Sequence, residues 1–179
     1  LTAAQRSAKM QQRRPAWRIK VDDELIAFTD MHYGRQQANL AHECGDFILR
    51  RSDGVYAYQL AVVIDDALMG VNQVVRGCDL LSSTPVQLYL YCLLNLTPPS
   101  FCHIPLLTDA AGCRLSKRDG DLEITALRQH FGSPEPIIGL LAYLAGQLPK
   151  PEPITAAELL PLFCPEKVPH DNIVVPQLL

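Results

Sequence analysis

Residues 55–90, VYAYQLAVVIDDALMGVNQVVRGCDLLSSTPVQLYL, decide the fold class of this chain. The run VNQVV at 71–75 ends abruptly at Arg76-Gly77, and the segment SSTP at 82–85 offers N-cap oxygens and a first-turn proline to a helix. This order of strand, loop and helix is typical of an α/β domain that binds a nucleotide. Ligands of open α/β sheets bind beyond the carboxyl ends of parallel strands, so Arg76 is well placed to hold an anion.

The composition of the 179-residue chain predicts a folded protein of one domain, or one domain with a small appendage, because 48% of its residues are hydrophobic. The net charge of -3 and the pI near 5.9 give it no overall basic character. Contact with nucleic acid would therefore depend on local patches such as Arg13-Arg14 and Arg50-Arg51. No apolar run approaches the roughly 18 residues of a membrane span and no signal peptide is present, so we expect a cytoplasmic protein without membrane contact.

The cysteines and histidines do not predict a metal site. No CxxC pair or Cys/His array joins the six cysteines, which are Cys44, Cys78, Cys92, Cys102, Cys113 and Cys164. The group of His32, His42, Glu43 and Cys44 suggests a metal, but no second ligand pair follows it. We therefore expect reduced thiols and no bound metal, zinc included.

The first part of the chain predicts short strands. Residues 1–14 are basic and compatible with a solvated helix, and residues 17–21 alternate between apolar and charged. We expect 25–29 to return as the partner of this strand, 31–45 to be irregular, and 47–49 to form another strand. A polar turn is expected at 50–54, where Asp53-Gly54 favours chain reversal.

The second part of the chain predicts mainly helices. Periodicity leaves 56–68 open between strand and helix, whereas 85–95 reads as helix and 101–107 as strand. Further helices are expected at 121–131 and 134–144, and Thr155 with Glu158 forms a capping-box pattern that opens a last helix over 159–163. The tail from Pro165 is expected to be extended.

Two separated motifs in this order resemble one family. The series YAYQLAVVIDDALMGVNQVVRGCDLL, followed by RLSKRDGD at 114–121, is similar to the C-terminal half of the catalytic core of the class I glutamyl-tRNA synthetase family, and in particular to its short glutamyl-Q tRNA(Asp) branch. The resemblance covers about 15–148. It implies an α/β fold, the second half of a Rossmann-like class I synthetase catalytic domain followed by a small helical domain, in which 56–68 is helical and 71–76 is a strand.

The resemblance also implies a division of the chain. Residues 1–45 correspond to the end of the family's connecting insertion with lead-in strands, 46–120 to the C-terminal half of the Rossmann-like domain with the KMSKS-like loop, and 121–179 to a helical, stem-contact-like region. The HIGH motif and the zinc cluster of the family are absent from the sequence. We therefore expect this chain to be a fragment, or to associate with a separate N-terminal half.

The resemblance assigns the candidate site residues. Lys117 corresponds to the phosphate-contacting, catalytic lysine of the KMSKS loop, and Ser116 precedes it in the ATP-binding site. Arg114 replaces the first lysine of that motif, which keeps the charge and changes the donor geometry. Tyr58 and Arg76 correspond to glutamate ligands, because a hydroxyl can bind the polar head and a guanidinium can hold a carboxylate in two places. On composition alone, the basic loop would be a solvated turn.

The residues considered without the family allow other roles. Tyr58 could be an ordinary core tyrosine, and Arg76 could cap a helix or pair with Asp65, Asp66 or Asp79. The neighbouring Asp65 and Asp66 look like paired carboxylates for a metal or for acid-base chemistry. A structural role near the end of a helix or loop is favoured for them, because adenylation needs no such pair.

The resemblance implies ATP-dependent activation of L-glutamate and its transfer to the queuosine base of tRNA(Asp), with Mg²⁺ accompanying ATP. A truncated glutamyl-tRNA synthetase that charges tRNA(Glu) is the first alternative. A non-catalytic fragment that binds tRNA or protein is the second. The expected assembly is a monomer, or a complex with the missing half.

Overall fold

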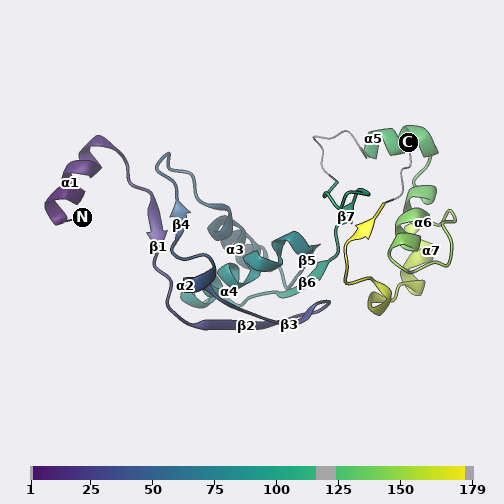
Figure 1. The fold of residues 1–179 in the computed structure, drawn as a ribbon, viewed down its shortest axis with the longest axis horizontal. Coiled ribbons are helices and arrows are strands. Elements are labelled where there is room, and N and C mark those ends of the chain that lie inside the picture. Colours follow the sequence, from purple (N-terminus) through teal and green to yellow (C-terminus); the bar gives the residue numbers. More distant parts are fainter. Residues whose placement is uncertain (1, 116–123, 176–179) are drawn as a thin grey trace. The chain divides into compact units, whose positions relative to one another are not determined.

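The structure is a computed structural model that describes residues 2–115 and 124–175. Its first elements are α1 (Ala3–Gln12), β1 (Trp17–Ile19), β2 (Leu25–Asp30), β3 (Gly34–Asn39), α2 (Leu40–Glu43), β4 (Phe47–Arg50), α3 (Tyr58–Met69), β5 (Gln73–Gly77) and the 3₁₀ helix η1 (Cys78–Ser83) (Figure 1). The later elements are α4 (Thr84–Leu93), β6 (Ser100–Ile104), β7 (Leu107–Thr108), α5 (Ile124–Phe131), α6 (Glu135–Leu144), α7 (Ala156–Leu159), the 3₁₀ helices η2 (Leu160–Leu162) and η3 (Pro165–Lys167), and β8 (Ile173–Val174).

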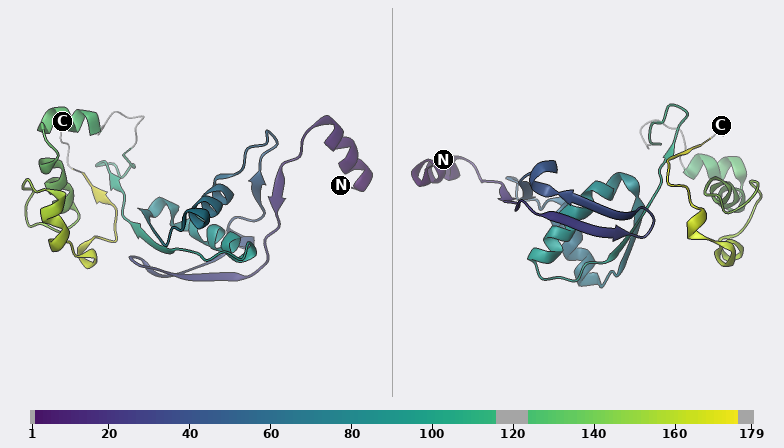
Figure 2. Two further views of the ribbon diagram at one scale, coloured as in Figure 1. Left: turned by 180° about the vertical axis from the view of Figure 1, so that it is seen from behind. Right: turned by 60° about the horizontal axis from the view of Figure 1, so that its bottom comes forward.

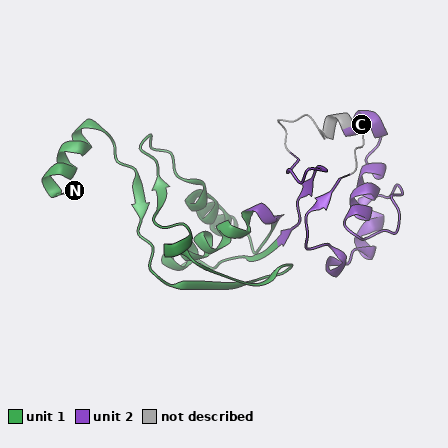
Figure 3. Cartoon of the chain, viewed as in Figure 1, with its two compact units in different colours: residues 1–75, 80–102 green, residues 76–79, 103–179 purple. Residues whose placement is uncertain are grey.

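The chain forms two compact units (Figure 3). Unit 1 contains residues 1–75 and 80–102, and unit 2 contains 76–79 and 103–179. Strands β5 and β6 pair with each other, and both continue from one unit into the next. The division into 1–45, 46–120 and 121–179 that the family resemblance implies assigns functional parts, and it stays a prediction.

A hairpin of β2 and β3 corrects two predictions for unit 1. The strands pair antiparallel from Leu25↔Asn39 to Asp30↔Gly34, so β2 does not return to β1 and residues 34–43 are not irregular. The turn forms because the buried Asp30 carboxylate accepts hydrogen bonds from the backbone N–H groups of His32 and Tyr33, at 3.0 and 2.9 Å. Gly34 completes the reversal with φ +69°.

Strand β1 pairs instead with β4, antiparallel, across an intervening hairpin. The predicted turn at 50–54 is confirmed: the N–H of Arg51 donates to the carbonyl of Val55 at 2.8 Å, and Gly54 adopts φ +94°. This turn delivers the chain to the start of α3.

Helices α3 and α4 carry the main core of unit 1. Helix α3 confirms the helical assignment of 56–68, which periodicity alone left open, and it ends at Gly70 in the left-handed conformation. Val63 of α3 is buried with Leu90 and Tyr91 of α4. The hairpin β2–β3 lies beside α4, as both views in Figure 2 show.

The segment between β5 and α4 departs from the predicted cap. Residues 78–83 form η1, which runs directly into α4, and the N-cap Ser83 has helical φ and ψ without a side-chain cap hydrogen bond. A preceding 3₁₀ turn supplies carbonyl partners to the first amides of the helix, so the serine oxygens are not needed.

Unit 2 combines one strand pair with short helices. Pro105 has no N–H to donate and separates β6 from β7, so the strand predicted at 101–107 is broken. The tail is not simply extended, since η3 precedes β8, which pairs parallel with β7 at Leu107↔Ile173. The capping box of Thr155 and Glu158 is confirmed, but it opens α7 at Ala156, and η2 follows in place of a helix over 159–163. Within the described part of the chain, no helix is long and apolar enough to cross a membrane.

Candidate active site

Arg76 occupies the penultimate position of β5, where its side chain is half-buried. Its Nε donates a hydrogen bond to Nε2 of His103 over 3.0 Å. His103 is fully buried on the neighbouring strand β6. The strand pairing thus fixes the predicted glutamate ligand beside a histidine that sequence reasoning did not single out.

His103 was missed because its sequence signal is weak. It stands in the apolar stretch FCHIP, where a lone histidine reads as part of the core. Beside it, burial raises the pKa of the Cys102 thiol, and the Asp30 carboxylate raises it further. Cys102 is therefore a neutral thiol at pH 7 and not a nucleophilic thiolate.

Gly77 follows Arg76 at a crowded point. A Cβ atom added there would lie 2.6 Å from Oδ1 of Asp79 and 2.9 Å from Cδ2 of Leu106. Both distances are shorter than a Cβ atom tolerates, so a larger residue here would force the ends of these two side chains to move. The Asp79 side chain therefore lies close to Gly77, at the end of β5.

Asp79 forms an ion pair with Arg114, the residue that opens the RLSKR loop. Arg114 is also held by a bridge to Thr108, and the next N–H, of Leu115, donates to the carbonyl of Leu107 at 3.2 Å. The segment after β5 and the root of the loop are therefore joined within unit 2. Ser116 and Lys117, which follow, lie outside the described residues.

The intervening turn at 109–113 is built by one carboxylate. Asp109 Oδ1 accepts hydrogen bonds from the N–H groups of Ala111 and Cys113, at 2.9 and 2.8 Å. The N–H of Asp109 in turn donates to the carbonyl of Cys113. This turn fixes the direction in which the chain enters the basic loop.

Tyr58 is the first residue of α3, in unit 1, and 57% of it is exposed. The interpretation of Tyr58 as an ordinary core tyrosine is therefore wrong. The following residue, Gln59, accepts a hydrogen bond from the amide of the buried Gln87 at 2.8 Å, which ties the start of α3 to α4. Tyr58 thus projects from an anchored helix end, whereas Arg76 belongs to unit 2.

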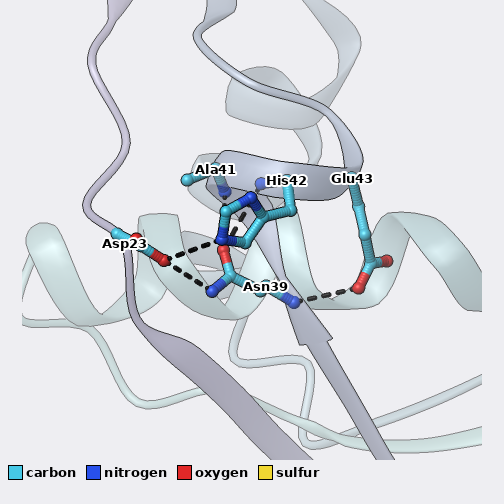
Figure 4. Close-up of polar contacts among 5 residues, drawn as sticks. All are labelled: Asp23, Asn39, Ala41, His42 and Glu43. Atoms are coloured by element: carbon cyan, nitrogen blue, oxygen red, sulfur yellow. Dashed lines mark hydrogen bonds and ion pairs between the residues drawn. The ribbon is translucent and has the colours of Figure 1, made fainter.

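Two other acidic or histidine-containing groups considered from the sequence lie in helix α3 and around helix α2. Asp65 and Asp66 lie in the last turns of α3, and the carbonyl of Asp66 accepts the N–H of Val71 that closes the helix. Figure 4 shows the network around α2, in which Asp23 contacts both His42 and Asn39, at 3.2 and 2.7 Å.

The side-chain oxygen of Asn39 in this network caps the N–H groups of Ala41 and His42, and Glu43 accepts the N–H of Asn39 (Figure 4). These groups serve the cap of a short helix. Among the described residues, no group of three or more His, Cys, Asp or Glu could hold a metal ion.

The two basic patches, Arg50-Arg51 and Arg13-Arg14, differ in the contacts that their side chains make. Arg51 pairs with Asp53 at 2.7 Å, and Arg50 donates to the carbonyl of Gly54 and lies over the ring of Tyr56. Arg13 and Arg14 instead line a shallow hollow of about 260 Å³ that Arg6 and Lys9 of α1 also line.

Comparison with known proteins shows which family and which relatives this chain matches. The model of the tRNA synthetases class I (E and Q), catalytic domain, matches residues 1–158. The chain is 51% identical over 164 residues to a glutamyl-Q tRNA(Asp) synthetase of Nitratidesulfovibrio vulgaris, covering 92% of this chain and 51% of that protein. It is 46% identical over 162 residues to one of Symbiobacterium thermophilum, with coverages of 90% and 50%. The chain thus spans about half the length of the curated relatives it matches.

Solved structures support the fold. A glutamate-tRNA synthetase from Elizabethkingia anophelis superposes with a TM-score of 0.75 over 98% of this chain and 40% of its own, at 24% identity. A glutamate tRNA ligase from Elizabethkingia meningosepticum gives a TM-score of 0.72 at 23% identity, over 99% and 39%. These likenesses confirm the fold class predicted from the sequence.

Proposed function

Because this chain belongs to the class I tRNA synthetases of the E and Q type, we propose that it is part of a glutamyl-Q tRNA(Asp) synthetase. Such an enzyme activates L-glutamate with ATP and transfers it to the queuosine base of tRNA(Asp). The observation that carries the proposal is the 51% identity to a relative of that name, over 92% of the chain.

The substrate roles of Tyr58 and Arg76 fit their surroundings. The hydroxyl of Tyr58 stands on a largely exposed side chain at an anchored helix end, where it can meet a small polar ligand. Arg76 is half-buried and held by its Nε, which suits a guanidinium that must present a fixed fork to a carboxylate. We assign both residues to glutamate binding.

We assign the binding of the ATP phosphates to the RLSKR loop, which begins at Arg114. During activation the glutamate carboxylate attacks the α-phosphate of ATP and pyrophosphate leaves, so negative charge grows on phosphate oxygens. Lys117, with Ser116 beside it, would stabilise that charge. Arg114 is engaged with Asp79, which supports a role in anchoring the loop and leaves the direct phosphate contact to Lys117.

The proposed cofactor chemistry needs only ATP and its counter-ion. Mg²⁺ would enter with the ATP phosphates, whose oxygens are the ligands that this ion prefers. The ATP-binding half that the family carries at its HIGH motif does not occur in this sequence. We therefore propose that activity resides in a longer polypeptide, or in a complex with that half, in the cytoplasm.

The first test is the acceptor specificity of the complete protein. Radiolabelled glutamate should be transferred to tRNA(Asp) that contains queuosine, and not to the same tRNA made without it. Charging of tRNA(Glu) would contradict the proposal and favour the truncated glutamyl-tRNA synthetase. The absence of any glutamate-dependent exchange between ATP and pyrophosphate would favour a non-catalytic binding protein.

Two substitutions test the proposed ligands. Tyr58→Phe removes only a hydroxyl and Arg76→Lys keeps only the charge, so each should raise the KM for glutamate by about tenfold, the equivalent of one good hydrogen bond. Tyr56→Phe is the matched control, because Tyr56 is 59% exposed and lies two residues away. An equal effect of Tyr56→Phe and Tyr58→Phe would remove Tyr58 from the site.

A further inference from the structure

We infer that His103 is a positioning residue for Arg76, which holds the guanidinium in the orientation in which it meets a carboxylate of glutamate. This inference rests on the proposed function, because it takes Arg76 to be a glutamate ligand. It adds to the site a residue that would touch no substrate.

The geometry that supports the inference is one short contact between neighbouring strands. Arg76 on β5 donates from Nε to Nε2 of His103 on β6, at 3.0 Å. His103 is 0% exposed and cannot move away from the arginine without disturbing the strand pair. The hydrogen bond therefore links the long Arg76 side chain to a fixed partner.

The guanidinium nitrogen that His103 engages determines how Arg76 can bind a carboxylate. A guanidinium can hold a carboxylate through Nε and one Nη, or through both Nη groups. Engagement of Nε by His103 excludes the first arrangement. A long arginine side chain also loses rotamer freedom when it binds, and a hydrogen bond formed in advance reduces that loss on substrate binding.

The contact defines the chemical state that His103 must have. Because Nε2 accepts a hydrogen bond, it carries no proton, and the neutral ring carries its proton on Nδ1. A protonated ring would lose the acceptor and set a second cation against Arg76. What the position needs is therefore an acceptor at the end of a side chain of this length, which the amide oxygen of glutamine can provide.

The test compares His103→Gln with His103→Leu in the complete protein, by glutamate-dependent exchange between ATP and pyrophosphate. His103→Leu fills the buried space without an acceptor, and it should raise the KM for glutamate about 10- to 100-fold, as expected for a hydrogen bond to a charged group. The KM for ATP should stay within about threefold of the wild type. His103→Gln should restore most of the glutamate affinity. His130→Leu, at an exposed site on α5, is the control.

Each other outcome overturns the inference in a distinguishable way. An unchanged KM for glutamate in His103→Leu removes the positioning role and leaves the proposed function intact. Equal losses in both variants, for both substrates and with a lowered Tm, make His103 a core residue only. A wild-type protein without glutamate-dependent exchange removes the proposed function, and His103 with it.

Discussion

The carboxylate of Asp79 pairs with the guanidinium of Arg114, so the chain just after β5 is joined to the first residue of the RLSKR loop. Arg76 lies three residues before this carboxylate, and Lys117 lies three residues after this arginine. The ion pair therefore connects the segment of the proposed glutamate ligand to the root of the proposed phosphate loop. This connection gives Arg114 a role that charge alone did not indicate.

We expect the pair to affect ATP use more than stability. Its side chains are 30% and 64% exposed, and pairs this exposed contribute about 1 kcal/mol at most. Asp79→Asn and Arg114→Met should each raise the KM for ATP by up to about fivefold, with little change in Tm. The double variant should be no worse than either single one, because both remove the same contact. Additive losses would show that the two residues act separately.

Gly139 provides a test of packing in unit 2. A Cβ atom there would lie 1.9 Å from the carbonyl oxygen of Glu152 and 3.3 Å from the nitrogen of Pro153. Glycine to alanine normally stabilises a helix by about 1 kcal/mol, but here the connector would have to leave α6. Gly139→Ala should therefore lower the free energy of unfolding by about 1–3 kcal/mol in urea denaturation.

The control for this substitution is Gly132→Ala. Gly132 adopts φ +73° with open space around its Cβ position, so only backbone strain of about 1 kcal/mol should appear there. A more stable Gly139→Ala protein would mean that the connector does not pack on α6.

The sequence predicted local structure better than pairing. Turn and cap chemistry identified the reversal at 50–54 and the capping box of Thr155, because these depend on neighbouring residues. The partner of β1 depends on contacts some thirty residues away, and β3 carries the polar residues Gln36 and Gln37 that read as loop. The ladder with β2 overrides their weak strand preference.

The sequence analysis proposed ligands for the candidate site, which stay predictions, and did not identify the residues that hold them in place. Arg76 and Tyr58 followed from motif order, whereas His103 and the pairing of Asp79 with Arg114 required strands and loops to meet. A lone buried histidine and an exposed carboxylate carry no signal at the sequence level. The proposed roles of Tyr58, Arg76, Ser116 and Lys117 stay predictions for the kinetic tests.

The capping box of α7 predicts a defined pH response. Hydrogen bonds from the backbone N–H and the hydroxyl of Thr155 lower the pKa of Glu158 below its ordinary value of 4.5. A lowered pKa in the folded state means that the carboxylate stabilises the fold above pH 4.5 and loses this effect as the pH falls through the folded-state value. NMR titration should find the Glu158 pKa lowered in the wild type and less lowered in Thr155→Ala, which keeps the backbone N–H and removes only the hydroxyl. Thr155→Ser, which keeps the hydroxyl, should resemble the wild type.

The basic N-terminal segment gives the last prediction. The first 21 residues carry six Lys or Arg and no Asp or Glu, in a chain whose net charge is -3. Helix α1 buries none of its residues, and its hollow is lined by Arg13 and Arg14. Among the described residues, Arg13 and Arg14 have no carboxylate partner and can attract an RNA backbone, whereas Arg51 is already paired with Asp53. Arg13→Glu with Arg14→Glu should therefore weaken tRNA binding modestly, and more than Arg51→Glu.

Salt distinguishes this effect from a loss of folding. Each lost phosphate contact should reduce the slope of log K against log salt by about 1, so the variant and the wild type should converge at high salt. Arg35→Glu, an exposed reversal on β3, is the control for the charge change of one substitution, and its effect is compared with that of Arg13→Glu alone. Attraction to phosphate is strongest at low salt. Equal binding of the Arg13 and Arg14 variant and the wild type under that condition would therefore place this surface outside the RNA interface.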